Sequence, residues 1–119
     1  MESSSQPAAG AANVTLTLSS GEKIRNPDHA QLQEALGKLD VARDGEGFAI
    51  LMRTEMTYMQ VSGDKKMGFD MEYQEGDVKH HYRAERTDFS LDDVVRAMEQ
   101  YRDGTIDWPQ YGSWHRITW

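Results

Sequence analysis

The chain of 119 residues contains no cysteine, which excludes disulfide bonds and thiolate metal ligands. No apolar run approaches the roughly 20 residues that a membrane-spanning helix needs. Positive charge is also scarce, because 13 lysines and arginines stand against 20 acidic residues, for a net charge of −7. Lysine and arginine must displace counterions when a protein binds a phosphate backbone. The charge therefore argues against a nucleic-acid partner and favours a basic protein partner.

The first twelve residues, MESSSQPAAGAA, are mostly Ser and Ala with one Gly and one Pro, and they offer no apolar face to bury. We expect a disordered tail over 1–12 and a single α+β domain over 13–119. The tail has neither the basic region nor the apolar region of a secretory signal. The sequence therefore predicts a cytoplasmic protein that does not contact a membrane.

Alternating apolar and polar residues predict seven strands, and two segments with a helical apolar stripe lie between them. The expected strands are 13–20, 22–25, 47–54, 57–63, 69–75, 78–84 and 113–119. Asn26 and Pro27 are typical of the start of the first helix. Ser90 and Asp93 predict a capped start for the second helix, and Gly104 its end.

This order of elements, β-β-α-β-β-β-β-α-β, predicts an α+β fold. We expect a mostly antiparallel sheet of about six or seven strands with two helices on one face. Residues 40–47 are polar and contain glycine, so a loop is expected there. A loop at Glu55 and Met56 would place Met52 opposite Met59, with Tyr58 and Gln60 on the face of Leu51.

The segment FDMEYQEGDVKHHYR, residues 69–83, has carboxylates before an EGD turn and cationic residues after it. A two-residue turn at Gly76 and Asp77 would pair Asp70 with Arg83, Glu72 with His81 and Tyr73 with His80. One face of this hairpin is then apolar and aromatic, and the other carries opposite charges. We expect the facing cations to keep both carboxylates ionised.

The sequence predicts no catalytic residue, no metal site and no cofactor. His80 and His81 are adjacent on a strand and point to opposite faces, so they cannot hold one ion together. Asp70 and Glu72 share a face about 7 Å apart, but both have cationic partners. No activated-serine motif and no glycine-rich phosphate loop occurs in the chain.

Exposed aromatic and acidic side chains suit a protein interface, and Trp and Tyr are frequent hot-spot residues there. The tryptophans could instead cover the core as an apolar lid, and the sequence leaves both readings open. The candidate partner-binding residues are Tyr58, Gln60, Asp70, Glu72, His81, Trp108, Tyr111 and Trp114.

Four features stand together in this chain: EMTYMQ after an apolar strand, FDMEYQEGDVKHHYRA, a helix ending in YRDG, and two tryptophans, Trp108 and Trp114. Together they resemble the small α+β immunity proteins of bacterial polymorphic toxin systems, often found beside deaminase-type toxins. The resemblance covers most of the chain from Val14 onward. It implies stoichiometric inhibition of a cognate toxin without catalysis, and it maps the family pattern onto Tyr58, Gln60, Glu72, Tyr73 and Trp114.

Two alternatives to this hypothesis stay open. The first is a ligand-binding or enzymatic domain with a polar cleft at Tyr58, Gln60, Glu72 and His81, which predicts a deep pocket and a carboxylate with a raised pKa. The second is a structural domain that forms a homodimer through its aromatic C-terminal end.

Overall fold

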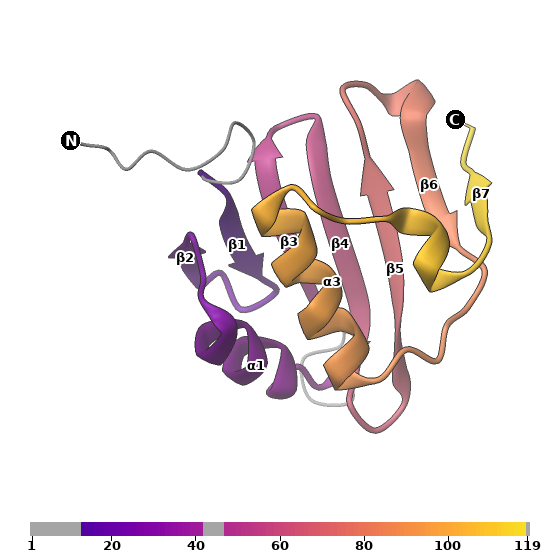
Figure 1. Ribbon diagram of the computed structural model, residues 1–119. Coiled ribbons are helices and arrows are strands. Elements are labelled where there is room, and N and C mark those ends of the chain that lie inside the picture. Colours follow the sequence, from indigo (N-terminus) through magenta and orange to yellow (C-terminus); the bar gives the residue numbers. More distant parts are fainter. Residues whose placement is uncertain (1–12, 42–46, 119) are drawn as a thin grey trace.

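The computed structural model describes residues 13–41 and 47–118, so the expected tail, most of the 40–47 loop and Trp119 lie outside the described residues. The described chain forms one seven-stranded sheet in the order β2-β1-β3-β4-β5-β6-β7, with every neighbouring pair antiparallel (Figure 1). The strands are β1 (Thr15–Leu18), β2 (Lys23–Arg25), β3 (Phe48–Thr54), β4 (Thr57–Asp64), β5 (Gly68–Gln74), β6 (His81–Ala84) and β7 (Trp114–Arg116). The predicted fold class and order of elements are confirmed.

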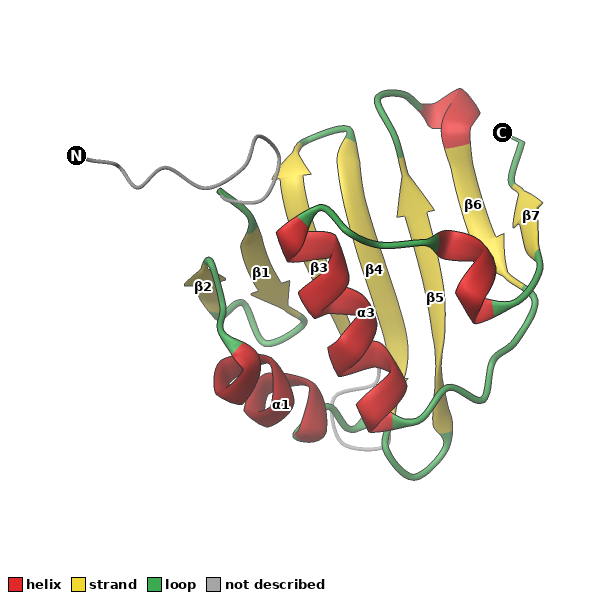
Figure 2. Cartoon of the chain, in the orientation of Figure 1, coloured by secondary structure: helices red, strands yellow, loops and turns green. Residues whose placement is uncertain are grey.

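Two helices, α1 (His29–Gly37) and α3 (Leu91–Asp103), lie on the same side of the sheet (Figure 2). Two short 3₁₀ helices, η1 (Val78–His80) and η2 (Trp108–Tyr111), interrupt the loops. Helix α3 crosses the middle strands, and η2 lies over β5 and β6 (Figure 1). None of the helices within residues 13–41 and 47–118 lies on the opposite face of the sheet, and we call that face the uncovered face.

The core lies between the sheet and the helices, because alternate strand residues point toward the helical layer. Its largest fully buried side chains include Leu16, Leu51, Met59, Phe69 and Met71 from strands. Helix residues complete it: Leu32, Ala35, Leu36, Val94, Val95, Ala97, Met98 and Tyr101. In both helices, the apolar side that the sequence predicts is therefore the side that is buried against the sheet.

The first helix starts later than predicted. Asn26 has a positive φ of 48°, and its side chain accepts a hydrogen bond from the Val14 backbone N–H at 3.0 Å. Asp28 is the N-cap instead, and it forms a capping box with Gln31. Asn26 therefore fastens the chain to β1, and Pro27 lies before the cap.

The second helix is capped as the sequence predicts. The Ser90 side chain accepts from the Asp93 backbone N–H at 3.1 Å, and the Asp93 carboxylate accepts from the Ser90 N–H at 3.1 Å. Gly104 ends the helix with a φ of 75°, in the left-handed conformation that glycine adopts without strain.

The expected register of β3 and β4 is wrong by one residue. Leu51 pairs with Met59 and Met52 with Tyr58, because the register shifts between Met52 and Thr54. The residue at this irregularity, Arg53, donates a hydrogen bond to the Tyr101 carbonyl near the end of α3. A shift of one residue exchanges the faces of a strand, so Tyr58 and Gln60 lie on the uncovered face and not on that of Leu51.

The expected two-residue turn at Gly76 and Asp77 is also wrong. Residues 75–80 form a longer loop, in which Asp77 caps η1 by accepting from the Lys79 backbone N–H at 2.9 Å. The strand pairs are Glu72 with Arg83 and Gln74 with His81, two residues from the expected register. An even shift preserves the faces, which is why the apolar and charged sides of β5 were still placed correctly.

Candidate functional site on the uncovered sheet face

The eight predicted partner-binding residues lie on two different sides of the sheet. Five of them share the uncovered face of the β4, β5 and β6 strands, and three lie on the helical side with η2 and β7. The first group is Tyr58, Gln60, Asp70, Glu72 and His81. The second group is Trp108, Tyr111 and Trp114.

A chain of hydrogen bonds fixes His81, whose exposed fraction is only 4%. Gln74 donates from Nε2 to the Met56 carbonyl at 3.2 Å, so its Oε1 faces His81 Nδ1 at 3.0 Å. The other ring nitrogen, Nε2, lies 2.8 Å from Glu72 Oε1. Each ring nitrogen of His81 therefore has a side-chain oxygen of β5 within hydrogen-bonding distance.

Tyr58 stands beside this chain on β4. Its ring meets that of His81 edge to face, with 6.2 Å between centroids. Burial, followed by the negative charge of Glu72, raises the pKa of Tyr58, so the phenol keeps its proton. Tyr58 therefore presents a neutral hydroxyl and an aromatic surface next to a carboxylate.

The carboxylate charge of Asp70 is less well balanced by nearby cations and hydrogen-bond donors than the sequence suggests. Its Oδ2 lies 3.6 Å from Arg83 Nη2, and its Oδ1 is buried without a hydrogen-bond partner in the described part of the chain. Burial raises the pKa of Asp70 despite the opposing effects of Arg83 and the Ser62 backbone N–H. The expectation that facing cations prevent such a rise is therefore wrong, because desolvation exceeds the attraction of a half-exposed arginine.

These side chains form the middle of the uncovered face. In the register of β4 and β5, Gln60 lies opposite Glu72 and Ser62 opposite Asp70. We define the central patch by its five residues, which are Tyr58, Gln60, Ser62, Asp70 and Glu72. On β3, the half-buried side chains of Ile50 and Met52 flank it. The central patch thus combines acidic, amide, hydroxyl and aromatic groups beside an apolar border.

The other three predicted residues, Trp108, Tyr111 and Trp114, pack against the core on the helical side of the sheet. The Trp108 ring stacks on Tyr73 at 3.8 Å between centroids, and the Trp114 indole N–H donates to the Trp108 carbonyl at 2.7 Å. Burial, the largest cause, raises the pKa of Tyr73 to about 12. Tyr111 is buried and donates to Gln100 at 2.7 Å. Trp108 and Trp114 are only partly buried, so an outer edge of this cluster meets solvent.

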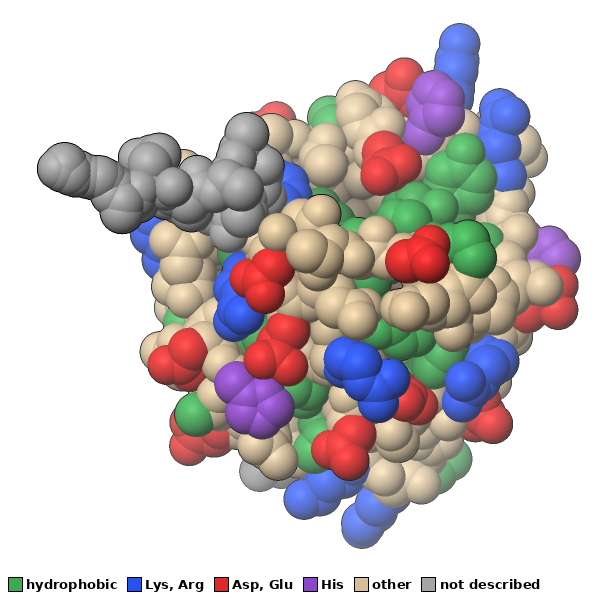
Figure 3. All heavy atoms as spheres, in the orientation of Figure 1, with side chains coloured by type: hydrophobic (Ala, Val, Ile, Leu, Met, Phe, Trp, Pro, Cys, Tyr) green, Lys and Arg blue, Asp and Glu red, His purple; other side chains and the backbone are tan. Residues whose placement is uncertain are grey.

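Negative charge is concentrated on the helical layer rather than on the uncovered face. The caps and bodies of α1 and α3 carry six acidic residues against two arginines and the lysine that caps α1, interspersed on the surface in Figure 3. The acidic ones are Asp28, Glu34, Asp92, Asp93, Glu99 and Asp103. Several are paired, for example Glu99 with His29 at 3.0 Å. Lys23 and Arg25 lie at the β2 edge of the sheet, away from the central patch.

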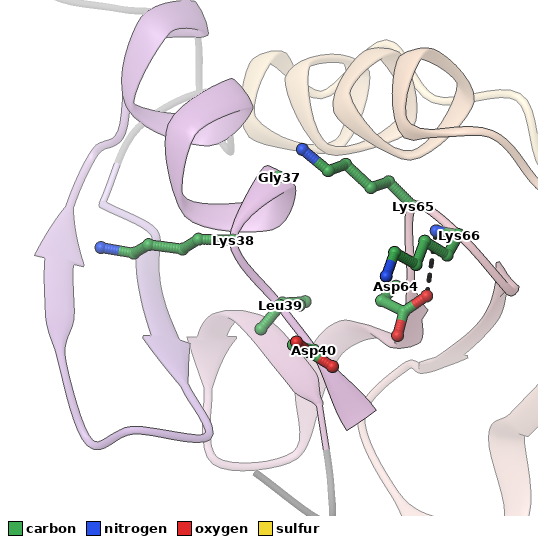
Figure 4. A pocket seen from close by; sticks show the side chains of 7 residues that line it. All are labelled: Gly37, Lys38, Leu39, Asp40, Asp64, Lys65 and Lys66. Atoms are coloured by element: carbon green, nitrogen blue, oxygen red, sulfur yellow. Dashed lines mark hydrogen bonds between the residues drawn. The ribbon is translucent and has the colours of Figure 1, made fainter. Parts of the chain in front are cut away.

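Four surface hollows of the described structure lie away from the central patch. One of about 340 Å³ lies between the end of α1 and the β4–β5 turn, where the amino groups of Lys38 and Lys65 lie apart (Figure 4). There the buried Asp64 accepts from three backbone N–H groups, and the Met67 N–H is the main cause of its lowered pKa. Three other hollows line the helices and the β7 end. None of these four is lined by a residue of the central patch.

Sequence reasoning missed Gln74, which orients His81, and the Met56 carbonyl, which orients Gln74. In the sequence, Gln74 stands between Tyr73 and a polar loop. That position does not show whether its amide is buried or exposed. Within residues 13–41 and 47–118, no three potential ligand side chains group around a metal position, and no helix is long and apolar enough to cross a bilayer. No family model and no curated protein matches the sequence, and no solved structure matches the fold.

Proposed function

We propose that this protein is a non-catalytic binding protein that inhibits a cognate bacterial toxin by covering a basic surface of it, as an immunity protein does. The central patch is the observation that supports this proposal most. It displays Tyr58 and two carboxylates in the middle of a sheet face that none of the described helices covers. Tyrosine is one of the residue types enriched at interface hot spots, and half-buried apolar side chains border it here.

The arrangement suits binding better than proton transfer. Both ring nitrogens of His81 are engaged by Gln74 and Glu72, and the ring is only 4% exposed, so a substrate has little access to it. Glu72 in turn is held in one orientation. A fixed carboxylate loses little conformational entropy when a partner binds it, which favours affinity.

The net charge of −7 also attracts a basic partner over a longer distance. Acidic groups on the helical layer attract a basic protein, and the field speeds its encounter even when contact occurs on another face. The proposed partner is therefore basic, and the central patch is the proposed area of contact.

The test is protection of cells that express the toxin encoded beside this gene, together with co-purification of the two proteins. We expect Asp70→Lys with Glu72→Lys to abolish protection and co-purification while circular dichroism shows an intact fold. The matched control is Glu34→Lys with Asp92→Lys, which makes the same charge change on the helical layer. Failure of the unaltered protein to bind any neighbouring gene product contradicts the proposal. Loss of protection only in the control places the contact on the helices.

A further inference from the structure

We propose that the uncovered face binds a second copy of this chain, so that two sheets pack face to face in a symmetric homodimer. The inference goes beyond the proposed function and does not rest on it, since the purified protein alone tests it. Three observations carry it. They are the apolar side chains on this face, the placement of opposite charges on either side of them, and the strand register that brings those charges to one level.

The first observation is that β3 is apolar on both sides. Ala49 and Leu51 point into the core, where both are fully buried. Phe48, Ile50 and Met52 alternate with them and point to the uncovered face, where they are half-buried. A strand that is apolar on both sides is typical of a sheet with both faces covered, whereas a solvated face carries polar residues. The described helices cover only one face, so β3 presents an apolar strip to a further layer (Figure 2).

The second observation is that opposite charges lie at equal distances from this strip. In the sheet, β1 and β2 lie on one side of β3, and β4 and β5 lie on the other. The outer strand of the first pair, β2, carries the exposed Lys23 and Arg25. The outer strand of the second pair, β5, carries Asp70 and Glu72. The cations and the carboxylates are therefore each two strands, or about 10 Å, from β3.

The third observation is the register, which places these charges at the same level along the strands. Lys23 pairs with Thr17, and Thr17 pairs with Ile50. Ile50 pairs with Gln60, and Gln60 pairs with Glu72. Residues directly opposite each other share a face of the sheet. One row of side chains thus crosses the uncovered face from a cation to a carboxylate, with Ile50 at its centre.

A twofold axis along β3 makes this face complementary to itself. Rotation about such an axis turns the second sheet over and exchanges the two sides of β3, so β2 of each copy lies over β5 of the other. Lys23 of one copy then faces Glu72 of the second copy, and the apolar strips meet at the axis. Stacked sheets keep their strand directions within about 30° of each other, so the axis stays close to β3. An axis across the strands would instead place the carboxylates of β5 over their own copies.

The same row selects a second copy over another cover from within the chain. A matching layer supplies an acid over β2, apolar surface over β3 and a cation over β5. Residues 1–12, which lie outside the described part of the chain, contain one carboxylate, Glu2, and neither lysine nor arginine. A second copy supplies all three groups in the required order.

The size of the overlap predicts a dimer that dissociates on dilution. Five strands at a spacing of about 4.8 Å span about 24 Å, and the seven residues of β3 span about 23 Å. The overlap is therefore about 500 Å² of sheet on each copy, at the lower end of the range for specific interfaces. We expect mostly monomer below about 10 µM and mostly dimer above about 100 µM.

The first test measures the mass and the contact surface of the full chain between about 5 and about 500 µM. We expect sedimentation velocity to show a change from monomer to dimer, with concentration-dependent amide NMR shifts along β1, β3 and β4. A monomer over the whole range overturns the proposal and leaves the face to residues 1–12 or to the toxin. Shifts confined to the helices, or to η2 and β7 at the aromatic end, also overturn it.

A variant at the centre of the row locates the axis. Ile50→Lys places two like charges close together beside the axis, and we expect dimerisation to weaken at least about tenfold. The matched control is Val78→Lys, because Val78 is an exposed apolar residue of η1 outside the overlap. It should leave dimerisation unchanged, and circular dichroism checks the fold of both variants. Equal losses in the two variants overturn the assignment of the face.

An exchange of charges tests the symmetry. Lys23→Glu and Glu72→Lys each place like charges face to face, so each variant alone should dimerise about tenfold more weakly. In an equal mixture, every altered residue faces the opposite charge on the other variant. We expect the mixture to form heterodimers within about threefold of the affinity of the unaltered chain. Failure of the mixture to regain affinity overturns the symmetric arrangement.

Two controls accompany the exchange. Lys79→Glu makes the same change of net charge on η1, outside the overlap, and should dimerise like the unaltered chain. A loss in this control equal to that in Lys23→Glu overturns the contact between β2 and β5. If Glu72→Lys does not fold, the losses in Lys23→Glu and Ile50→Lys, each against its control, still decide the proposal.

The homodimer covers the central patch, so the second copy and the toxin compete for one face. We expect added toxin to convert the dimer into a complex with one copy of each protein. Protection of cells by a protein that is monomeric at every concentration removes the homodimer and leaves the proposed function standing. A dimer that stays intact when it binds the toxin moves the toxin contact to another face and leaves the homodimer standing.

Discussion

His81 Nε2 lies 2.8 Å from Glu72 Oε1, within hydrogen-bonding distance, although the two residues are not opposite each other in the sheet. Gln74 is the residue opposite His81, and it takes the other ring nitrogen. A single buried ring thus joins two positions of β5. This contact links the stability of the hairpin to the orientation of an acidic group on the proposed binding surface.

Replacing His81 by leucine is expected to destabilise the fold by about 2 kcal/mol, because the side chains of Gln74 and Glu72 lose a buried hydrogen-bond partner. Urea unfolding measures the change. His115→Leu is the matched control, since its contact with Glu85 is exposed and its loss should cost less than about 0.5 kcal/mol. Similar costs for both variants would show that the hydrogen-bond chain contributes little.

Asp70→Asn is expected to stabilise the fold at neutral pH. The folded pKa of Asp70 is raised above 3.8, so the folded protein binds the proton more tightly than the unfolded chain does. Stability contributed by this group is therefore lost as pH rises from 3.8 through the raised folded value. Urea midpoints of both proteins from pH 3 to pH 7 should show the advantage of the variant only above that window. A less stable variant at pH 7 would mean that the attraction of Arg83 exceeds the cost of burial.

Gly63→Ala is expected to cost about 3 kcal/mol or more. Gly63 has a φ of 119°, and an added Cβ would come within 2.2 Å of the Gly68 carbonyl oxygen on the neighbouring strand. Gly21→Ala is the control, because its φ of 96° imposes similar backbone strain while nothing lies within 4 Å. That strain alone costs about 1–2 kcal/mol. Equal unfolding free energies for the two variants would contradict the close approach of β4 and β5.

Trp114→Phe is expected to destabilise the fold by about 1 kcal/mol, since it removes the indole N–H that binds the Trp108 carbonyl. The near-ultraviolet dichroism of the Tyr73, Trp108 and Trp114 cluster should change with it. Trp108→Phe keeps both the carbonyl and an aromatic ring against Tyr73, so it separates the hydrogen bond from the stacking. A Trp114→Phe variant as stable as the parent would show that packing alone holds η2.

Ser90→Ala is expected to cost about 1 kcal/mol by removing the N-cap of α3. Thermal and urea unfolding measure this loss, with the exposed Ser113→Ala as the control. A neutral result at Ser90 would indicate that Asp93 and the packed face of α3 hold the first turn without the hydroxyl.

Patterns of neighbouring residues in the sequence are enough to predict the helices and strands. The stripe of Val94, Met98 and Tyr101 and the caps at Ser90 and Gly104 predicted α3, since these contacts lie within one segment. The same holds for the alternation of β5, where Phe69, Met71 and Tyr73 are buried. A helix cap or an alternating strand face depends on residues close together in the chain, so the local sequence predicts it.

Strand registers and the placement of the site depended on distant contacts. Arg53 reaches the end of α3, and the register between β3 and β4 shifts beside it, which placed Tyr58 and Gln60 on the uncovered face. His81 bonds Gln74 and Glu72, and Asp77 caps η1, which extended the predicted two-residue turn. The pKa of Asp70 likewise depends on how deeply the finished sheet buries it.

The sequence by itself determined the element order, the two amphipathic helices and which side of β5 is apolar, because each follows from residue spacing within a segment. Only the tertiary structure decided that five of the predicted binding residues meet on one face while three close the core on the other. The reason is that a one-residue shift between paired strands exchanges their faces, and the energy that selects the register comes from side chains far away in the chain.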